Sequence, residues 1–191
     1  MNENIDYAKK KFYQMISDFG SDPYNLVSHL NEMEKWAKYL LKINPSADKE
    51  TVLIAVWLHD IGHYPINTNK DHAIIGEELS LKILNQIGYK KNKIENIIHC
   101  VRAHRCKDIM PKSIEAKIIA CADSASHMTD STYFDMSKDD LKANNPFRAY
   151  KKIERDFKDL DLFPQIKKEL EDMYFAWKNL ISSYEKLNLK S

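Results

Sequence analysis

The chain has 191 residues, and its 29 Lys and Arg against 28 Asp and Glu give a formal net charge of +1. This length predicts one domain, or one domain with a small appendage, that buries a substantial core, and the charge balance gives no general attraction for nucleic acid or an anionic membrane. The four glycines spell neither the GxGxxG of dinucleotide-binding folds nor the GxxxxGK[ST] of a P-loop, which argues against both.

The N-terminus and the cysteines indicate a cytoplasmic protein. Residues 1–11 are charged from the third residue on and lack the apolar segment of a secretory signal. The longest apolar run, about Val52 to Leu58, is far short of the roughly 20 residues that span a membrane. The three cysteines contain no CxxC pair, so neither a disulfide framework nor a cysteine zinc site is expected.

Proline and glycine divide the chain into segments of helical length, and none of these segments alternates in hydrophobicity with a period of two. We therefore expect an all-α fold, with helices at 4–19, 24–42, 49–61, 71–87, 91–104, 113–127, 138–143, 146–160 and 164–187. Asp48 and Ser113 are expected to be N-caps, and Ser137 with Asp140 resembles a capping box.

Several polar residues fall on the apolar faces of separate helices, because positions i, i+3, i+4 and i+7 of a helix share one face. These inward-facing residues are His29, His59, His72, His104 and Asp123, with Asp60 next to His59. His99 lies well away from the apolar stripe that His104 extends, so we expect it to be exposed. The inward-facing histidines and aspartates have two possible explanations. One is that they are independent, hydrogen-bonded core residues. The other is a shared divalent metal, which would satisfy the imidazoles and carboxylates together.

The segment Leu58-His-Asp-Ile-Gly-His63 resembles the signature of the HD-domain metal-dependent phosphohydrolase superfamily. An upstream His29 and a downstream Asp123, which ends the segment Ile118-Ile-Ala-Cys-Ala-Asp123, complete the pattern His, His-Asp, Asp in order. The resemblance covers about residues 20 to 130. It implies an HD-domain-like helical bundle with a metal site at its centre.

By this resemblance, His29, His59, Asp60 and Asp123 bind one divalent ion, which is Mn, Fe, Co, Ni, Zn or Mg. Some relatives bind a second ion, for which His72 and His104 are the candidates here; with one ion only, these two would line the pocket and contact phosphate. Dinuclear relatives often have two adjacent histidines at the later position, and this sequence has none.

Asp60, His63 and His104 are the expected catalytic residues. His63, one turn after His59, is expected to be a phosphate contact or a proton donor, or else simply a histidine that suits the dipole at a helix end. His127, four residues after Asp123, is expected to hydrogen-bond the Asp123 carboxylate. Gly62 is expected to end the helix that carries His59, and Gly76 to leave room in the pocket beside His72.

The resemblance implies hydrolysis of a small phosphorylated substrate, an ester or anhydride such as a nucleotide. The alternatives are a di-iron oxygenase of the same fold and a non-catalytic, metal-containing helical binding module. We expect a single domain over residues 1–191, with its core at about 20–130 and C-terminal helices at 138–187 packed on it. No membrane or nucleic-acid partner is expected, and homo-oligomerisation is left open.

Overall fold

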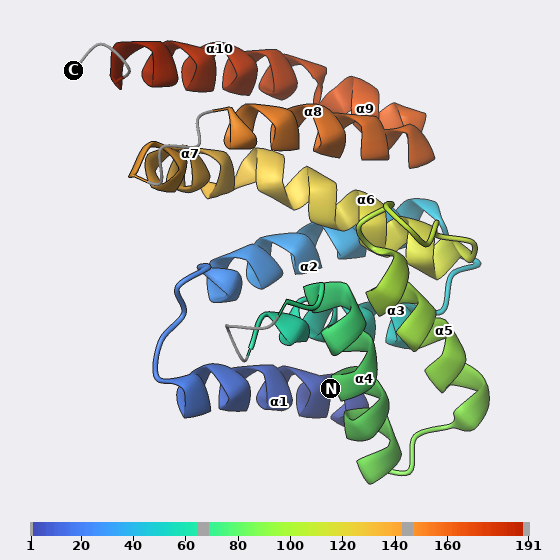
Figure 1. Cartoon of the computed structure of the whole chain (residues 1–191). Coiled ribbons are helices and arrows are strands. Elements are labelled where there is room, and N and C mark those ends of the chain that lie inside the picture. Colours follow the sequence, from blue (N-terminus) through green and yellow to red (C-terminus); the bar gives the residue numbers. More distant parts are fainter. Residues whose placement is uncertain (1, 65–68, 143–146, 189–191) are drawn as a thin grey trace. The chain divides into compact units, whose positions relative to one another are not determined.

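The computed structural model describes residues 2–64, 69–142 and 147–188, and within these ranges it is helical without any strand (Figure 1). The prediction of an all-α fold is confirmed. None of the described helices is both long enough and apolar enough to cross a membrane. The chain divides into two compact units, Met1–Ala122 and Asp123–Ser191.

The first unit contains α1 (Glu3–Phe19), α2 (Leu26–Ile43), α3 (Lys49–Leu58), the 3-10 helix η1 (Ile61–His63), α4 (His72–Gln86) and α5 (Lys91–Ala103). Helix α6 (Ile114–Thr129) contains the boundary between the units. The second unit continues with α7 (Thr132–Lys142), α8 (Arg148–Asp159), the 3-10 helix η2 (Leu160–Leu162), α9 (Pro164–Glu169) and α10 (Glu171–Asn188).

Helix α3 is the centre of the first unit. Every residue from Thr51 to Leu58 is buried, because α3 packs against α1, α2 and α5 (Figure 1). A helix that is covered on all sides needs apolar residues all round, which explains the unbroken apolar run in its sequence. Its start is fixed by Asp48, whose carboxylate accepts the backbone N–H of Thr51 at 2.8 Å and confirms the predicted N-cap.

Gly62 and Gly76 bring the backbones of η1 and α4 into contact. A Cβ at Gly62 would lie 2.0 Å from the carbonyl oxygen of His72 and 2.5 Å from the amide nitrogen of Gly76. A Cβ at Gly76 would lie 3.2 Å from the carbonyl oxygen of His59. The two glycines therefore let the start of α4, with His72, approach the end of α3.

In the second unit, α7, α8 and α10 pack on one another (Figure 1). Tyr133 of α7 is fully buried and makes an edge contact with Trp177 of α10, whose indole N–H donates to the carbonyl of Met128 at 2.8 Å. Phe157 of α8 stacks on Tyr174 of α10 at 3.9 Å between ring centroids. These aromatic residues join the helices of this unit to one another.

Some boundaries differ from the prediction. Helix α3 ends at Leu58 rather than 61, so His59 and Asp60 lie in the turn before η1. Helix α7 begins at Thr132, because the Asp130 carboxylate accepts the N–H of Thr132 at 2.7 Å. The capping box at Ser137 is wrong, since Ser137 lies inside α7 and is buried.

The remaining expectations concern the N-cap at Ser113, the C-terminal helices and their packing. The Ser113 hydroxyl accepts the N–H of Ala116 at 3.1 Å, as expected for an N-cap. The last expected helix is divided at Leu170, and residue 146, the expected start of α8, lies outside the described residues. Packing of the C-terminal helices on the core stays a prediction.

Candidate metal centre

Two buried histidines follow the ends of α3 and α5, and backbone carbonyls fix the orientation of both rings. His59 Nδ1 lies 2.9 Å from the carbonyl oxygen of Val56, and His104 Nδ1 lies 2.7 Å from that of Val101. Because a carbonyl oxygen only accepts, Nδ1 carries the proton in each ring. In a neutral imidazole the remaining lone pair is then on Nε2, which is the arrangement of metal-binding histidines.

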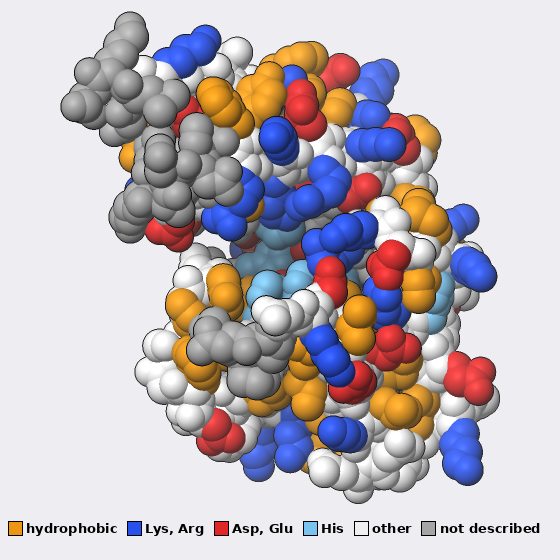
Figure 2. Space-filling view, viewed as in Figure 1, with side chains coloured by type: hydrophobic (Ala, Val, Ile, Leu, Met, Phe, Trp, Pro, Cys, Tyr) orange, Lys and Arg blue, Asp and Glu red, His pale blue; other side chains and the backbone are white. Residues whose placement is uncertain are grey.

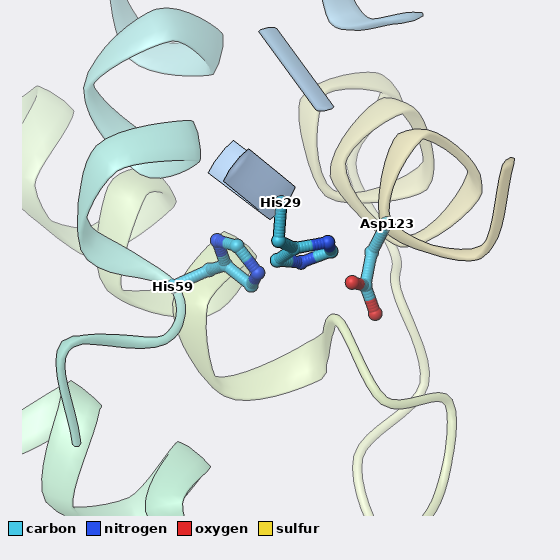
Figure 3. Close-up of side chains that lie close together, drawn as sticks. All are labelled: His29, His59 and Asp123. Carbon is cyan, nitrogen blue, oxygen red and sulfur yellow. The ribbon is translucent and has the colours of Figure 1, made fainter. Parts of the chain in front are cut away.

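One oxygen of Asp60 faces the first set of imidazoles. Asp60 Oδ2 lies 3.3 Å from His59 Nε2 and 3.7 Å from Nε2 of His29, which α2 contributes. His29 and His59 also form a group with Asp123 of α6, in which the ligand atoms lie within 4.8 Å of one another. Figure 3 shows these three side chains pointing toward a common space.

The other oxygen of Asp60 faces a second set of imidazoles. Asp60 Oδ1 lies 3.3 Å from His72 Nε2 and 3.6 Å from the Nε2 atoms of both His63 and His104. The Nε2 atoms of His72 and His104 are 3.3 Å apart, and the rings of His63 and His72 stack at 4.0 Å between centroids. The Asp60 carboxylate therefore lies between two sets of imidazoles, one at each oxygen.

The second set is the more accessible of the two. The side chains of His63 and His72 are 24% and 21% exposed, although His104 of the same set is buried; in the first set, both His29 and His59 are buried. Histidine side chains are accordingly visible at the molecular surface in Figure 2, which also shows acidic and basic side chains interspersed over that face. Within the described residues, His63 and His72 are therefore the most solvent-exposed imidazoles of the site.

Charge and burial set the protonation of the central groups. Burial opposes ionisation of Asp60, but the neighbouring His59 and His63 hold the pKa of its carboxyl well below the usual range. Burial lowers the pKa of His63 to about 4, although Asp60 acts in the opposite direction. The site therefore combines an ionised carboxylate with neutral imidazole, the forms in which both residues bind metals.

These donors fit a divalent metal ion. Two ligands of one ion, each about 2.1 Å from it, are at most about 4.2 Å apart. The distances from the Asp60 oxygens to the five imidazoles, 3.3 to 3.7 Å, all fall below this limit. Within the described part of the chain, the candidate ligand groups are His29–His59–Asp123, His59–Asp60–His104 and Asp60–His63–His72, none of which includes a cysteine.

The structure brings together the residues that the sequence singles out as ligands. His29, His59, Asp60, His72, His104 and Asp123 all belong to the candidate groups, and their roles as ligands stay predictions. His63, expected to be a phosphate contact or proton donor, falls among the candidate ligands as well. His99 is only half-buried and lies outside these groups, where its Nε2 accepts the backbone N–H of Lys112 at 2.9 Å.

Sequence reasoning missed the pairing of Asp71 with Arg105. Asp71 caps α4 by accepting the N–H of Ala73 at 3.0 Å, and the same carboxylate is bound by the Arg105 guanidinium. Asp71 directly precedes His72, so this pair fixes the start of the helix that carries His72. An aspartate at a helix start is a recognisable N-cap signal, but its arginine partner is 34 residues away and has no local signature.

Comparison with known proteins identifies the family. The model of the HD domain matches residues 26–128, which is more than half of the chain, and the chain belongs to this family. It is also 32% identical over 114 residues to a tRNA (cytidine(56)-2'-O)-methyltransferase of Picrophilus torridus. That match covers 52% of this chain and 30% of the relative, so the chain spans less than a third of that protein's length. No solved structure matches the chain at a significant level.

Proposed function

We propose that the chain is a metal-dependent phosphohydrolase that cleaves a phosphate ester or anhydride of a small substrate such as a nucleotide. Membership of the HD family supports this class of reaction. The observation that carries the proposal is the position of Asp60, a buried ionised carboxylate with imidazoles at both of its oxygens. Such a carboxylate is suited to bridging two ions or to completing the ligand shell of one.

The proposed ligands of the first ion are His29, His59, Asp60 and Asp123. Asp60, His72 and His104 form the candidate second site. The adjacent histidine pair of dinuclear relatives is missing here, but His63 lies 3.6 Å from Asp60 Oδ1 and offers a further imidazole on that side. When bound, a divalent cation lowers the pKa of a coordinated water and polarises a phosphoryl oxygen.

The proposed role of the chain's own exposed groups is to orient the substrate. His63 and His72 are the accessible imidazoles, so a substrate phosphate would meet them first. Two nearby arginines are already engaged with acidic side chains, Arg105 with Asp71 and Arg102 with Asp108. Among the described residues, the imidazole N–H groups of His63, and of His72 where it binds no ion, are the donors that we propose for phosphoryl oxygens.

Elemental analysis and phosphatase assays of the purified chain test the proposal. We expect bound divalent metal, hydrolysis of at least one phosphoester in a broad panel with added Mn²⁺, and loss of both in Asp60→Asn. His99→Ala is the matched control, because His99 is a histidine of the same unit outside the ligand groups, and it should retain metal and activity.

Full metal content in the folded Asp60→Asn variant would refute the ligand assignment. Oxygen consumption by the iron-loaded chain, without phosphoester hydrolysis, would instead favour an oxygenase. Metal binding without turnover of any substrate in the panel would favour a binding module.

A further inference from the structure

A buried group of polar side chains lies in the second unit and includes one of the proposed metal ligands. Its members come from α6, α7 and α8, and we call it the α6–α8 network: Asp123, His127, Tyr133, Lys152 and Asp156. His127, Tyr133 and Asp156 are all buried. Burying polar groups is costly unless each has hydrogen-bonding or ionic partners. The partners of each member of the network therefore indicate its role.

His127 lies between two carboxylates. Its Nε2 is 3.6 Å from Asp123 Oδ1, and its Nδ1 is 3.1 Å from Asp156 Oδ2. Asp123 and His127 are four residues apart on α6, so the helix itself holds them side by side. The imidazole thus connects Asp123 to Asp156, a residue of a different helix.

Asp156 is held in place from several directions. The Tyr133 hydroxyl donates to Asp156 Oδ2 at 3.0 Å, and Lys152 Nζ lies 3.1 Å from the same oxygen and 3.2 Å from His127 Nδ1. Burial alone would raise the pKa of Asp156, but Lys152 and His127 keep it below its usual value. Asp156 is therefore an ionised carboxylate, contacted by Tyr133 and Lys152, that lies against His127 Nδ1.

A purely structural role would not require the histidine. Lys152, one turn before Asp156 on α8, already neutralises that carboxylate, and Tyr133 supplies a neutral hydrogen bond. The additional contact through His127 leads to Asp123. We propose that Asp156, acting through His127, is a positioning residue that orients the Asp123 carboxylate for metal binding. This inference rests on the proposed function, in which Asp123 is a ligand.

The test is the affinity of the full chain for Mn²⁺, measured by electron paramagnetic resonance of the free ion. Partners that orient a ligand typically change metal affinity by about 10- to 100-fold. We expect His127→Ala and Asp156→Asn each to weaken Mn²⁺ binding within this range. Because Asp156 acts through His127, the double variant should bind no more weakly than His127→Ala alone. Multiplicative losses in the double variant would overturn the proposal.

Further variants keep the test independent of folding. Should Asp156→Asn not fold, Tyr133→Phe removes only the hydroxyl donor and should still weaken Mn²⁺ binding, by about threefold. Glu185→Gln is the control, because Glu185 is a buried carboxylate of α10 whose contacts include Ser137 of α7. It should leave Mn²⁺ affinity unchanged, and an equal loss there would overturn the proposal.

The same titration separates this inference from the proposed function. If Asp123→Asn and Asp60→Asn lose Mn²⁺ binding while His127→Ala binds normally, only the positioning role fails. If Asp123→Asn itself binds Mn²⁺ normally, the ligand assignment under the proposed function fails.

Discussion

Replacement of Gly62 by alanine tests the close approach of η1 to α4. The new Cβ would lie 2.0 Å from the carbonyl oxygen of His72, where ordinary contact begins at 3.4 Å, so the two backbones must separate by about 1.4 Å. Overpacking usually costs about 1–3 kcal/mol. Backbone atoms cannot rotate away as side chains do, so we expect this variant to lose about 3 kcal/mol of unfolding free energy. For a chain of this length, that loss lowers Tm by about 6–12 °C.

Gly88→Ala is the matched control in the same unit. Gly88 has a φ of +62°, but a Cβ at this position would have no atom within 4 Å, so alanine meets only backbone strain. That strain costs about 1 kcal/mol and lowers Tm by about 2–4 °C. Thermal unfolding followed by circular dichroism compares the two variants. If Gly62→Ala melts no lower than Gly88→Ala, the account of the η1–α4 contact is refuted.

The remaining predictions concern a raised pKa and the thiols. Burial, together with Asp156 and Asp123, raises the pKa of Asp159 to about 7, so the folded state retains a proton that the unfolded chain releases above about pH 4. Stability is therefore lost as pH rises from about 4 to 7. At pH 8, denaturant unfolding should give Asp159→Asn a free energy of unfolding about 1 kcal/mol higher than that of the original chain, a value already reduced for solvent screening. At about pH 4 the two chains should be equally stable. Cys106, which is half-buried, should react with a thiol reagent in the native state, whereas Cys100 and Cys121 should react only after unfolding; burial also raises the pKa of the Cys100 thiol. The first expectation is contradicted if the original chain and Asp159→Asn show the same dependence of stability on pH. The second is contradicted if all three cysteine thiols of the native chain react rapidly with the reagent.

Helical periodicity predicted the elements and the inward-facing residues well. The choice of His104 over His99 followed from angles around one helix alone, and the structure buries His104 while leaving His99 half-exposed. Such predictions succeed because the side of a helix that faces the core is encoded locally, in the spacing of its apolar residues.

Contacts between distant segments could not be predicted in the same way. Gly76 was expected to leave room in the pocket, but it instead allows its helix to meet the backbone of His59 and Gly62. Likewise, nothing near Asp156 in the sequence indicates that His127, 29 positions earlier, will contact it. These contacts depend on how helices pack in three dimensions, which local spacing does not specify.

The carbonyls of Val56 and Val101 order the rings of His59 and His104 as the chain folds, before any ion binds. The side-chain entropy of these two residues, roughly 1 kcal/mol each, is therefore lost during folding and does not weaken the later uptake of an ion. The same carbonyl contacts would hold both rings whichever divalent ion bound there. If His59 and His104 are ligands as proposed, their orientation would select little between divalent ions, and the availability of each ion would matter more.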